Sequence, residues 1–328
     1  MIRFGVLGCG RIGQVHARSL KQLSGARVAA VSDAYEDAAR SLAGEVGAEV
    51  RESAAIIGAD DIDAIVICTP TDIHADQVQA AAAAGKPVFC EKPIDLDVGR
   101  VRECLSAVSA AGIPLMIGFQ RRFDPHFRAL KEALDAGRIG TIEQIAITSR
   151  DPSPPPPEYI RRSGGIFRDM AIHDFDMARF LLGQPIRRVL AIGAALVDKE
   201  IGTLGDFDTA TILMEAEGGA QVVITNSRRA TYGYDQRVEV LGSGGALNVG
   251  NQTVANLTTA TGDRFETPVL LNFFMDRYRE AYAAEMQAFM NVIQNGTAPP
   301  VTGEDGLEAL RLADAATLSA QEGRWVEL

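Results

Sequence analysis

The chain has 328 residues, which is more than one hydrophobic core usually holds and predicts two domains. With 47% hydrophobic and 23% charged residues its composition is that of a soluble globular protein, and a formal net charge of −11 argues against a surface for nucleic acid or an anionic membrane. The opening MIRFGVLGCG lacks the apolar core and cleavage site of a signal peptide, and no run is long enough to span a bilayer. The four cysteines have neither paired nor metal-type spacing, so we expect free thiols in a reducing cytoplasm.

In the first 120 residues, short β-rich runs such as IRFGVLG and DAIVICT alternate with helix-length amphipathic stretches. This alternation is typical of βαβ units and predicts a doubly wound parallel sheet. We expect the helices near residues 11–24, 34–47, 72–85 and 97–111.

Beyond residue 120 the pattern changes to α+β. A helix near 125–136 and a strand at 141–151 precede the proline run DPSPPPPEY, which predicts an extended surface loop. After a helix within 163–183, four strand-like runs follow with no helices between them, so we expect a large, open, mostly antiparallel sheet. Helices near 274–294 and 303–321 and an edge strand in RWVEL end the chain.

The glycine-rich loop after the first strand carries the clearest motif. Gly8, Gly10 and Gly13 form G-x-G-x-x-G around Arg11 and Ile12, and Asp33 follows the next strand about twenty residues later. Such glycines let the backbone approach a pyrophosphate at a helix N-terminus, while the acid accepts hydrogen bonds from ribose hydroxyls. Because Asp33 would repel the 2′-phosphate of NADP, the motif predicts NAD as the cofactor.

The ends of two later strands should line the same cofactor crevice. Thr69 and Pro70 follow the third long strand and His74 begins the next helix, although a lone histidine there is more often a capping or surface residue. Glu91 and Lys92 end the following strand. A single lysine at a strand end is usually a solvated charge, but its place beside the glycine loop favours a role in the site.

The helix within 163–183 carries acids and an imidazole among apolar residues. Ala171, Phe175, Ala178 and Leu182 form an apolar stripe, and Asp169, His173 and Asp176 form a second stripe that we expect to face a site. For an isolated helix, a first-turn acid near the helix dipole and a satisfied buried imidazole would be the simpler interpretation. A metal site in HDFD is a weaker alternative, because oxidation of an alcohol by NAD needs no metal when a base and a cation are supplied.

Five segments together resemble the Gfo/Idh/MocA oxidoreductases over nearly the whole chain: GVLGCGRIGQVHARSL, CTPTDIHAD, EKPIDLD, GFQRRFDP and SGGIFRDMAIHDFDMARFLLG. The last two segments, with TYGYDQRVEVLG, look most like the inositol 2-dehydrogenase branch. The resemblance implies a Rossmann domain over residues 1–120 and an α+β domain for substrate binding and oligomerisation over 121–328, with the last helix free to pack back on the first domain. Gln120, where many relatives have Asn, is a mild departure that bears only on fine substrate discrimination.

By this resemblance Lys92, Asp169 and His173 match the catalytic lysine, aspartate and histidine. The implied reaction is oxidation of the axial C2 hydroxyl of myo-inositol by hydride transfer to nicotinamide C4, with no metal. His173 would act as general base, Asp169 would fix its tautomer, and Lys92 would stabilise the developing negative charge on oxygen. A further group, named from segment resemblance and polar character, would hold the other hydroxyls: Arg122, Asp151, Tyr234 and Tyr278.

The resemblance also implies a homotetramer built through the open sheet. Two other functions stay open: a dehydrogenase of the same family acting on another inositol isomer or sugar, and a non-catalytic NAD-binding sensor. The sensor would need no base, so the set of Lys92, Asp169 and His173 argues against it.

Overall fold

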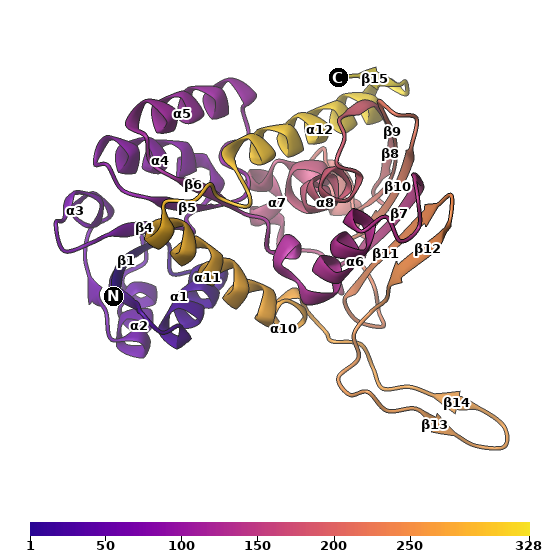
Figure 1. Cartoon of the computed structure of the whole chain (residues 1–328), viewed down its shortest axis with the longest axis horizontal. Coiled ribbons are helices and arrows are strands. Elements are labelled where there is room, and N and C mark those ends of the chain that lie inside the picture. Colours follow the sequence, from indigo (N-terminus) through magenta and orange to yellow (C-terminus); the bar gives the residue numbers. More distant parts are fainter. The chain divides into compact units, whose positions relative to one another are not determined.

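The computed structural model describes residues 1–328, which divide into two compact units (Figure 1). The first unit comprises Met1–Phe123 and Glu280–Leu310, and the second comprises Asp124–Arg279 and Arg311–Leu328. Each unit therefore combines a main segment with a later helical piece of the chain. None of the helices combines the length and the apolar character that crossing a bilayer requires.

The first unit is built on a six-stranded parallel sheet with the order β3-β2-β1-β4-β5-β6. The chain order reverses between β1 and β4, so the carboxyl ends of these neighbouring strands form the switch point where α/β sheets bind ligands. Its strands are β1 (Ile2–Leu7), β2 (Ala26–Ser32), β3 (Glu49–Val50), β4 (Ala64–Ile67), β5 (Val88–Glu91) and β6 (Leu115–Gly118). The Rossmann architecture expected from the sequence is confirmed.

Helices cover both faces of this sheet, which is why β4, β5 and β6 are buried throughout. On one face, Phe4 of β1 and Phe89 of β5 pack against Phe289, with ring centroids 6.2 and 5.9 Å away. Figure 1 shows α4 and α5 together on the other face. The helices of this unit are α1 (Arg11–Gln22), α2 (Glu36–Val46), α3 (Ser53–Gly58), α4 (His74–Ala83), α5 (Val98–Ala111), α11 (Arg279–Asn295) and the first part of α12 (Gly303–Glu322), with short 3-10 turns η1 (Thr71–Ile73) and η2 (Gln120–Phe123).

The second unit contains a seven-stranded mixed sheet with the order β12-β11-β7-β10-β9-β8-β15. Only the β7–β10 pair is parallel, so the sheet is mostly antiparallel, as expected. Its strands are β7 (Ile142–Arg150), β8 (Ile186–Ala194), β9 (Thr209–Ala216), β10 (Gln221–Ser227), β11 (Asp235–Gly242), β12 (Gly245–Val249) and β15 (Val326–Glu327).

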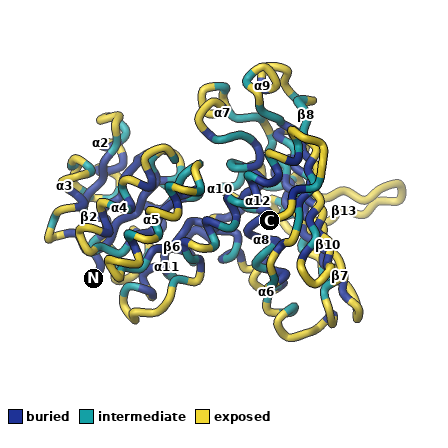
Figure 2. Tube along the Cα trace, turned by 90° about the horizontal axis from the view of Figure 1, so that it is seen from above, coloured by how far each residue is buried: buried dark blue, intermediate teal, exposed yellow.

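The two faces of this second sheet differ in burial (Figure 2). One face, with Ile147, Ile212 and Ile224, is buried, and the unit's helices supply the apolar cover. The strand registers place four exposed apolar residues on the opposite face: Ile192, Leu213, Val223 and Leu241. The second unit's helices are α6 (Pro125–Asp135), α7 (Pro157–Ser163), the π-helical turn η3 (Phe167–Ala171), α8 (Ile172–Leu182), α9 (Lys199–Thr203), α10 (Phe274–Arg277) and the remainder of α12.

Three local features differ from the sequence-based expectation. The proline run is not loop throughout, because Pro157 opens α7, where its missing N–H costs no helical hydrogen bond. The expected helix within 163–183 is interrupted at Gly164, which has a φ of 81°, and then contains the π turn η3. A projecting hairpin, β13 (Thr259–Ala260) and β14 (Phe265–Glu266), was not anticipated.

Candidate active site

In the glycine loop of the first unit, Gly8 and Gly13 are each required by the packing of the fold itself. Gly8 has a φ of 93°, and a Cβ there would lie 2.4 Å from the carbonyl oxygen of Cys68. A Cβ on Gly13 would lie 1.9 Å from the carbonyl oxygen of Gly8, so close packing of α1 on the loop requires glycine. Gly10, in contrast, has no atom within 4 Å of its Cβ position. The open side of Gly10 is where the motif's backbone would approach a pyrophosphate.

The first turn of α1 is arranged to meet an anion. Gly10 is the N-cap and provides no side-chain hydrogen bond, so the N–H groups of Arg11, Ile12 and Gly13 are not capped by it. No acidic residue lies in this turn. The helix dipole and these donors together favour a bound phosphate group.

Asp33, directly after β2, is fixed beside the loop. Its Oδ2 accepts a hydrogen bond from the Cys9 N–H at 2.6 Å, and its Oδ1 accepts one from the Tyr35 N–H at 2.8 Å. Asp33 is partly exposed, so its remaining lone pairs can accept hydrogen bonds from ribose hydroxyls. Burial and the Asp33 charge raise the pKa of Cys9 to about 12, so the neighbouring thiol stays protonated.

The ends of β4 and β5 hold the other residues expected around the cofactor. Thr69 is partly exposed and Pro70 is exposed. His74 is 2% exposed, and its two ring nitrogens lie 2.8 Å from the Pro93 carbonyl and 2.6 Å from the Thr69 carbonyl. His74 therefore links the chain after β4 to the chain after β5. Because both ring nitrogens face backbone carbonyls, His74 can influence a ligand only by positioning that backbone.

Glu91 and Lys92 differ in environment although they are neighbours. Glu91 is 8% exposed, and its Oε1 lies 2.6 Å from Nε2 of the fully buried His16 on α1. Lys92 is partly exposed at the carboxyl end of β5. The pair with His16 anchors the end of the strand from which Lys92 emerges.

In the second unit, Asp169 lies in the π turn η3 and His173 in the first turn of α8. A π turn is rare and often marks a functional position, because it shifts the side chains that follow relative to an α-helix. The two residues are four apart in continuous helical backbone and both are partly exposed.

Asp176 does not share this environment. It is 1% exposed, and Asp174 is fully buried, with its Oδ2 accepting a hydrogen bond from Asn226 Nδ2 at 2.7 Å. Asp169 lies in the π turn that precedes α8, whereas His173 and Asp176 both belong to the regular helix α8, so the polar stripe expected through residues 169, 173 and 176 has one member that the fold buries. Asp169 and His173 are the accessible members of the stripe.

Two residues that the sequence did not single out surround Asp169. The hydroxyl of Tyr159 donates to Asp169 Oδ1 at 2.8 Å, and Nη1 of Arg228 donates to Oδ2 at 3.3 Å. The negative charge of Asp169 raises the pKa of Tyr159 well above its ordinary value, so Tyr159 is a donor. Tyr159 follows a proline run and Arg228 follows a strand in SRR, and neither position has a spacing that would have revealed it.

The four residues expected to hold further hydroxyls have different surroundings. Arg122, in the first unit, forms an ion pair with Asp305 at 3.0 Å. Asp151 is partly exposed after β7, and its N–H donates to the Ser227 carbonyl at 3.0 Å. Tyr234 and Tyr278 are 5% and 0% exposed and pack edge to face, with centroids 6.0 Å apart.

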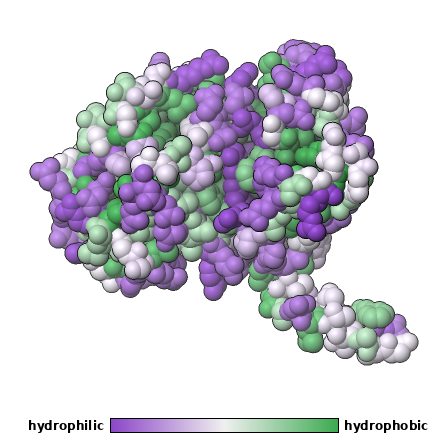
Figure 3. Space-filling model, in the orientation of Figure 1, coloured by the Kyte–Doolittle hydropathy of each residue, from purple (hydrophilic) through white to green (hydrophobic).

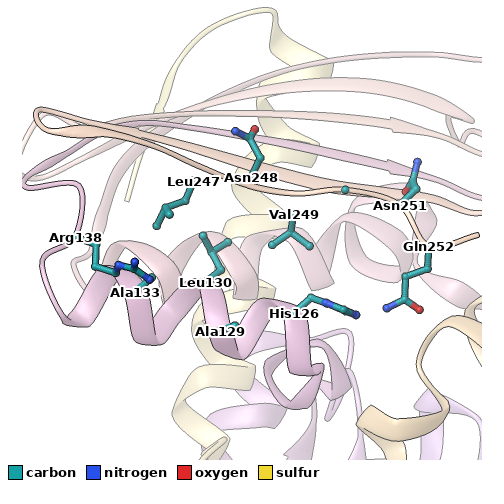
Figure 4. Close-up of a pocket in the computed structure, with 11 residues that line it drawn as sticks. His126, Ala129, Leu130, Ala133, Arg138, Leu247, Asn248, Val249, Asn251 and Gln252 are labelled. Carbon is teal, nitrogen blue, oxygen red and sulfur yellow. The ribbon is translucent and has the colours of Figure 1, made fainter. Parts of the chain in front are cut away.

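A cavity of about 470 Å³ lies elsewhere in the second unit, between α6 and β12 (Figure 4). His126, Leu130 and Arg138 line its helix side, and Leu247 and Asn251 belong to its strand side. None of the expected site residues lines it. No group of three or more His, Cys, Asp or Glu side chains is arranged to hold a metal ion.

Comparison with known proteins gives matches over the whole chain. A family model described as an oxidoreductase family with an NAD-binding Rossmann fold matches residues 2–119, and the GFO/IDH/MocA C-terminal domain matches residues 127–248. Inositol 2-dehydrogenase of Rhizobium meliloti (strain 1021) is 55% identical over 327 residues, which cover 100% of this chain and 99% of that protein.

Two solved structures are also similar over nearly their full length. A myo-inositol dehydrogenase from Corynebacterium glutamicum superposes with a TM-score of 0.96 at 40% identity, covering 100% of this chain and 99% of the other. A scyllo-inositol dehydrogenase from Lactobacillus casei, with bound NAD(H) and scyllo-inositol, gives a TM-score of 0.93 at 30% identity and the same coverage.

Proposed function

The chain belongs to the Gfo/Idh/MocA family of oxidoreductases, and from that premise we propose that it oxidises the axial C2 hydroxyl of myo-inositol to the 2-ketone with NAD. The observation that carries the substrate assignment is the full-length 55% identity to an inositol 2-dehydrogenase. The pairing of an NAD-type loop with an accessible Asp169 and His173 supports the dehydrogenase chemistry.

The first unit's residues fit NAD. The open side of Gly10 and the uncapped first turn of α1 would receive the pyrophosphate, and Asp33 would accept hydrogen bonds from the adenosine ribose. Thr69, Pro70, Glu91 and Lys92 would border the same cofactor at the ends of β4 and β5, with His74 supporting them. Bound NAD supplies the hydride acceptor of the reaction.

Three side chains would handle the proton and the charge on oxygen. His173, neutral at working pH, removes the proton from the reacting hydroxyl, since imidazole is the side chain that titrates nearest to neutrality. Asp169 holds the imidazole in one tautomer and stabilises its protonated form. Lys92 donates a hydrogen bond to the substrate oxygen while negative charge develops there.

The remaining hydroxyls of a ring with six such groups need many donors and acceptors. Asp151 and Arg122 offer charged partners, and Tyr234 and Tyr278, which pack edge to face on each other, offer phenol groups. A site of this kind rejects analogues that leave its polar groups without partners.

We also propose a cytoplasmic homotetramer built through the second unit's sheet. All four cysteines are free and buried, which suits a reducing compartment. The outer face of the sheet exposes Ile192 by 68% and Leu213 by 38%, and Figure 3 shows apolar residues on the projecting hairpin, where Phe265 is 80% exposed. A sheet face and a hairpin of this composition suit contact with other copies of the chain.

Replacement of His173 or Lys92 by Ala tests the assignment of the chemistry. Each variant should lose at least about a hundredfold in kcat, the usual effect of removing a general base or a donor to developing charge, while its affinity for NAD stays near normal. The wild-type kcat/KM should fall at acid pH as the base is protonated. The assays are initial rates of NADH formation and fluorescence titration with NAD, and near-normal turnover in His173→Ala would remove that residue from the mechanism.

A further inference from the structure

The carboxylate of Asp169 lies between two donors that come from different elements. Tyr159 belongs to α7 and Arg228 follows β10, and each reaches one oxygen of Asp169, at 2.8 and 3.3 Å. With both oxygens engaged, the carboxylate plane cannot turn freely. We call Tyr159 and Arg228 the Asp169 clamp.

Arg228 is a buried cation with few other partners. Its side chain is 1% exposed, and its Nε and Nη2 atoms have no hydrogen-bond partner. An arginine does not lose its proton in a protein, so the buried charge needs a nearby anion. Besides Asp169, the nearest acid is Asp206, whose Oδ2 lies 3.7 Å from Nη2.

Asp206 is itself held in place. Its Oδ1 accepts a hydrogen bond from the Ile166 N–H at 2.8 Å, one turn before Asp169, and its side chain is 9% exposed. The backbone N–H of Arg228 donates to the Asp208 carbonyl at 2.8 Å. The cation is therefore fixed between two carboxylates, and protonation of Asp169 would leave it with only the more distant one.

We propose that the Asp169 clamp positions the catalytic base: Arg228 keeps Asp169 ionised, and Tyr159 fixes the rotation of its carboxylate, so that His173 is held in the tautomer that accepts the substrate proton. The inference rests on the proposed function, which gives Asp169 and His173 their roles. Tyr159 and Arg228 act through Asp169 and are positioning residues. A carboxylate that orients an imidazole is useful only when it is charged and immobile.

The simpler alternative is that the clamp only holds α7 and the end of β10 against the π turn. Both interpretations predict lower thermal stability when the contacts are lost. They differ in turnover, because a structural role gives no reason for kcat to depend on the charge at position 228 once the variant is folded and binds NAD.

The test compares Tyr159→Phe, Arg228→Met and Arg228→Lys with wild type, and repeats the first two in an Asp169→Asn background. Assays use NAD with the inositol or sugar that wild type oxidises fastest, together with NAD titration and thermal unfolding. Arg3→Met is the control, since Arg3 makes a two-point ion pair with Asp63 at the opposite, amino ends of β1 and β4.

We expect Tyr159→Phe to lower kcat about tenfold and Arg228→Met about a hundredfold, with KM changed less than about threefold, because the loss is in orientation of the base. Arg228→Lys should recover at least about tenfold of that loss, since the charge is restored without the guanidinium geometry. In the Asp169→Asn background neither change should lower kcat by more than about twofold, because both act through the Asp169 carboxylate.

Losses in kcat that are the same with and without the Asp169 carboxylate would overturn the proposed role of the Asp169 clamp. Near-normal kcat in Tyr159→Phe and Arg228→Met would also overturn it. If Arg228→Met fails to fold, the kcat of Tyr159→Phe with and without the Asp169 carboxylate decides, together with the kcat of Arg228→Lys relative to wild type. A wild-type enzyme that oxidises a sugar but no inositol would contradict the proposed substrate and leave the clamp to be judged on that sugar. Inactivity of wild type toward every polyol would contradict both.

Discussion

Addition of one methyl group should have different effects at Gly10 and Gly13: at Gly10 it should weaken NAD binding with little change in stability, and at Gly13 it should destabilise the fold. In Gly10→Ala the new Cβ meets no atom within 4 Å, and the backbone φ of −67° and ψ of −169° suit alanine. Loss of glycine at a helix N-cap costs about 0.5–1 kcal/mol, and the stiffer unfolded chain offsets about 0.4–1 kcal/mol of that. The net change in the free energy of unfolding is therefore within about 1 kcal/mol, or a melting shift of about 4 °C or less.

Binding of NAD by Gly10→Ala should nevertheless be severely weakened. The methyl group fills the space through which the backbone would approach the pyrophosphate, and loss of one charge-assisted hydrogen bond costs about 1.5–3 kcal/mol, a tenfold to hundredfold or greater rise in Kd. In Gly13→Ala the Cβ would lie 1.9 Å from the Gly8 carbonyl oxygen, so we expect at least about 3 kcal/mol of destabilisation. Thermal unfolding and NAD fluorescence titration of both variants are the assays. Wild-type NAD affinity in folded Gly10→Ala would refute the placement of the pyrophosphate at this loop.

Two further predictions concern cofactor choice and assembly. Asp33→Ala should lower kcat/KM for NAD about tenfold to a hundredfold and raise the relative use of NADP, and a wild type that prefers NADP would contradict the role of this carboxylate. Leu213→Glu places a charge on the exposed sheet face and should shift the proposed tetramer to smaller species in light scattering. Leu318→Glu on α12, where the residue is equally exposed (37% against 38%), should not. An unchanged oligomer mass for Leu213→Glu would contradict an interface on this face of the sheet.

The sequence alone predicted those parts of the structure that depend on patterns among neighbouring residues. The alternation of strands and helices and the G-x-G-x-x-G spacing are local, and they sufficed for the Rossmann sheet and its NAD loop. The edge strand in the last residues was also expected, and β15 pairs with β8.

The surroundings of Asp169 could not be derived in this way. A π turn has no dependable sequence signature, so the helical period was carried unbroken from residue 169. Asp176, three residues after His173 in the regular helix α8, was assigned to an accessible face, but the tertiary fold buries it. Tyr159 and Arg228 reach Asp169 across 10 and 59 residues of sequence, and only the tertiary fold brings them there. His74 was placed in the cofactor crevice by its position, whereas its contacts are with two backbone carbonyls.

Kinetic comparison of polyols tests the proposed function most directly. Only the C2 hydroxyl of myo-inositol is axial, whereas scyllo-inositol has no axial hydroxyl and can present this geometry only by rebinding the whole ring. Glucose can offer an axial anomeric hydroxyl and should react weakly. The measurement is kcat/KM with NAD for the three compounds under one set of conditions. We predict that myo-inositol has the highest value, with scyllo-inositol a poor substrate; a higher kcat/KM for scyllo-inositol or glucose would contradict the assignment of the substrate.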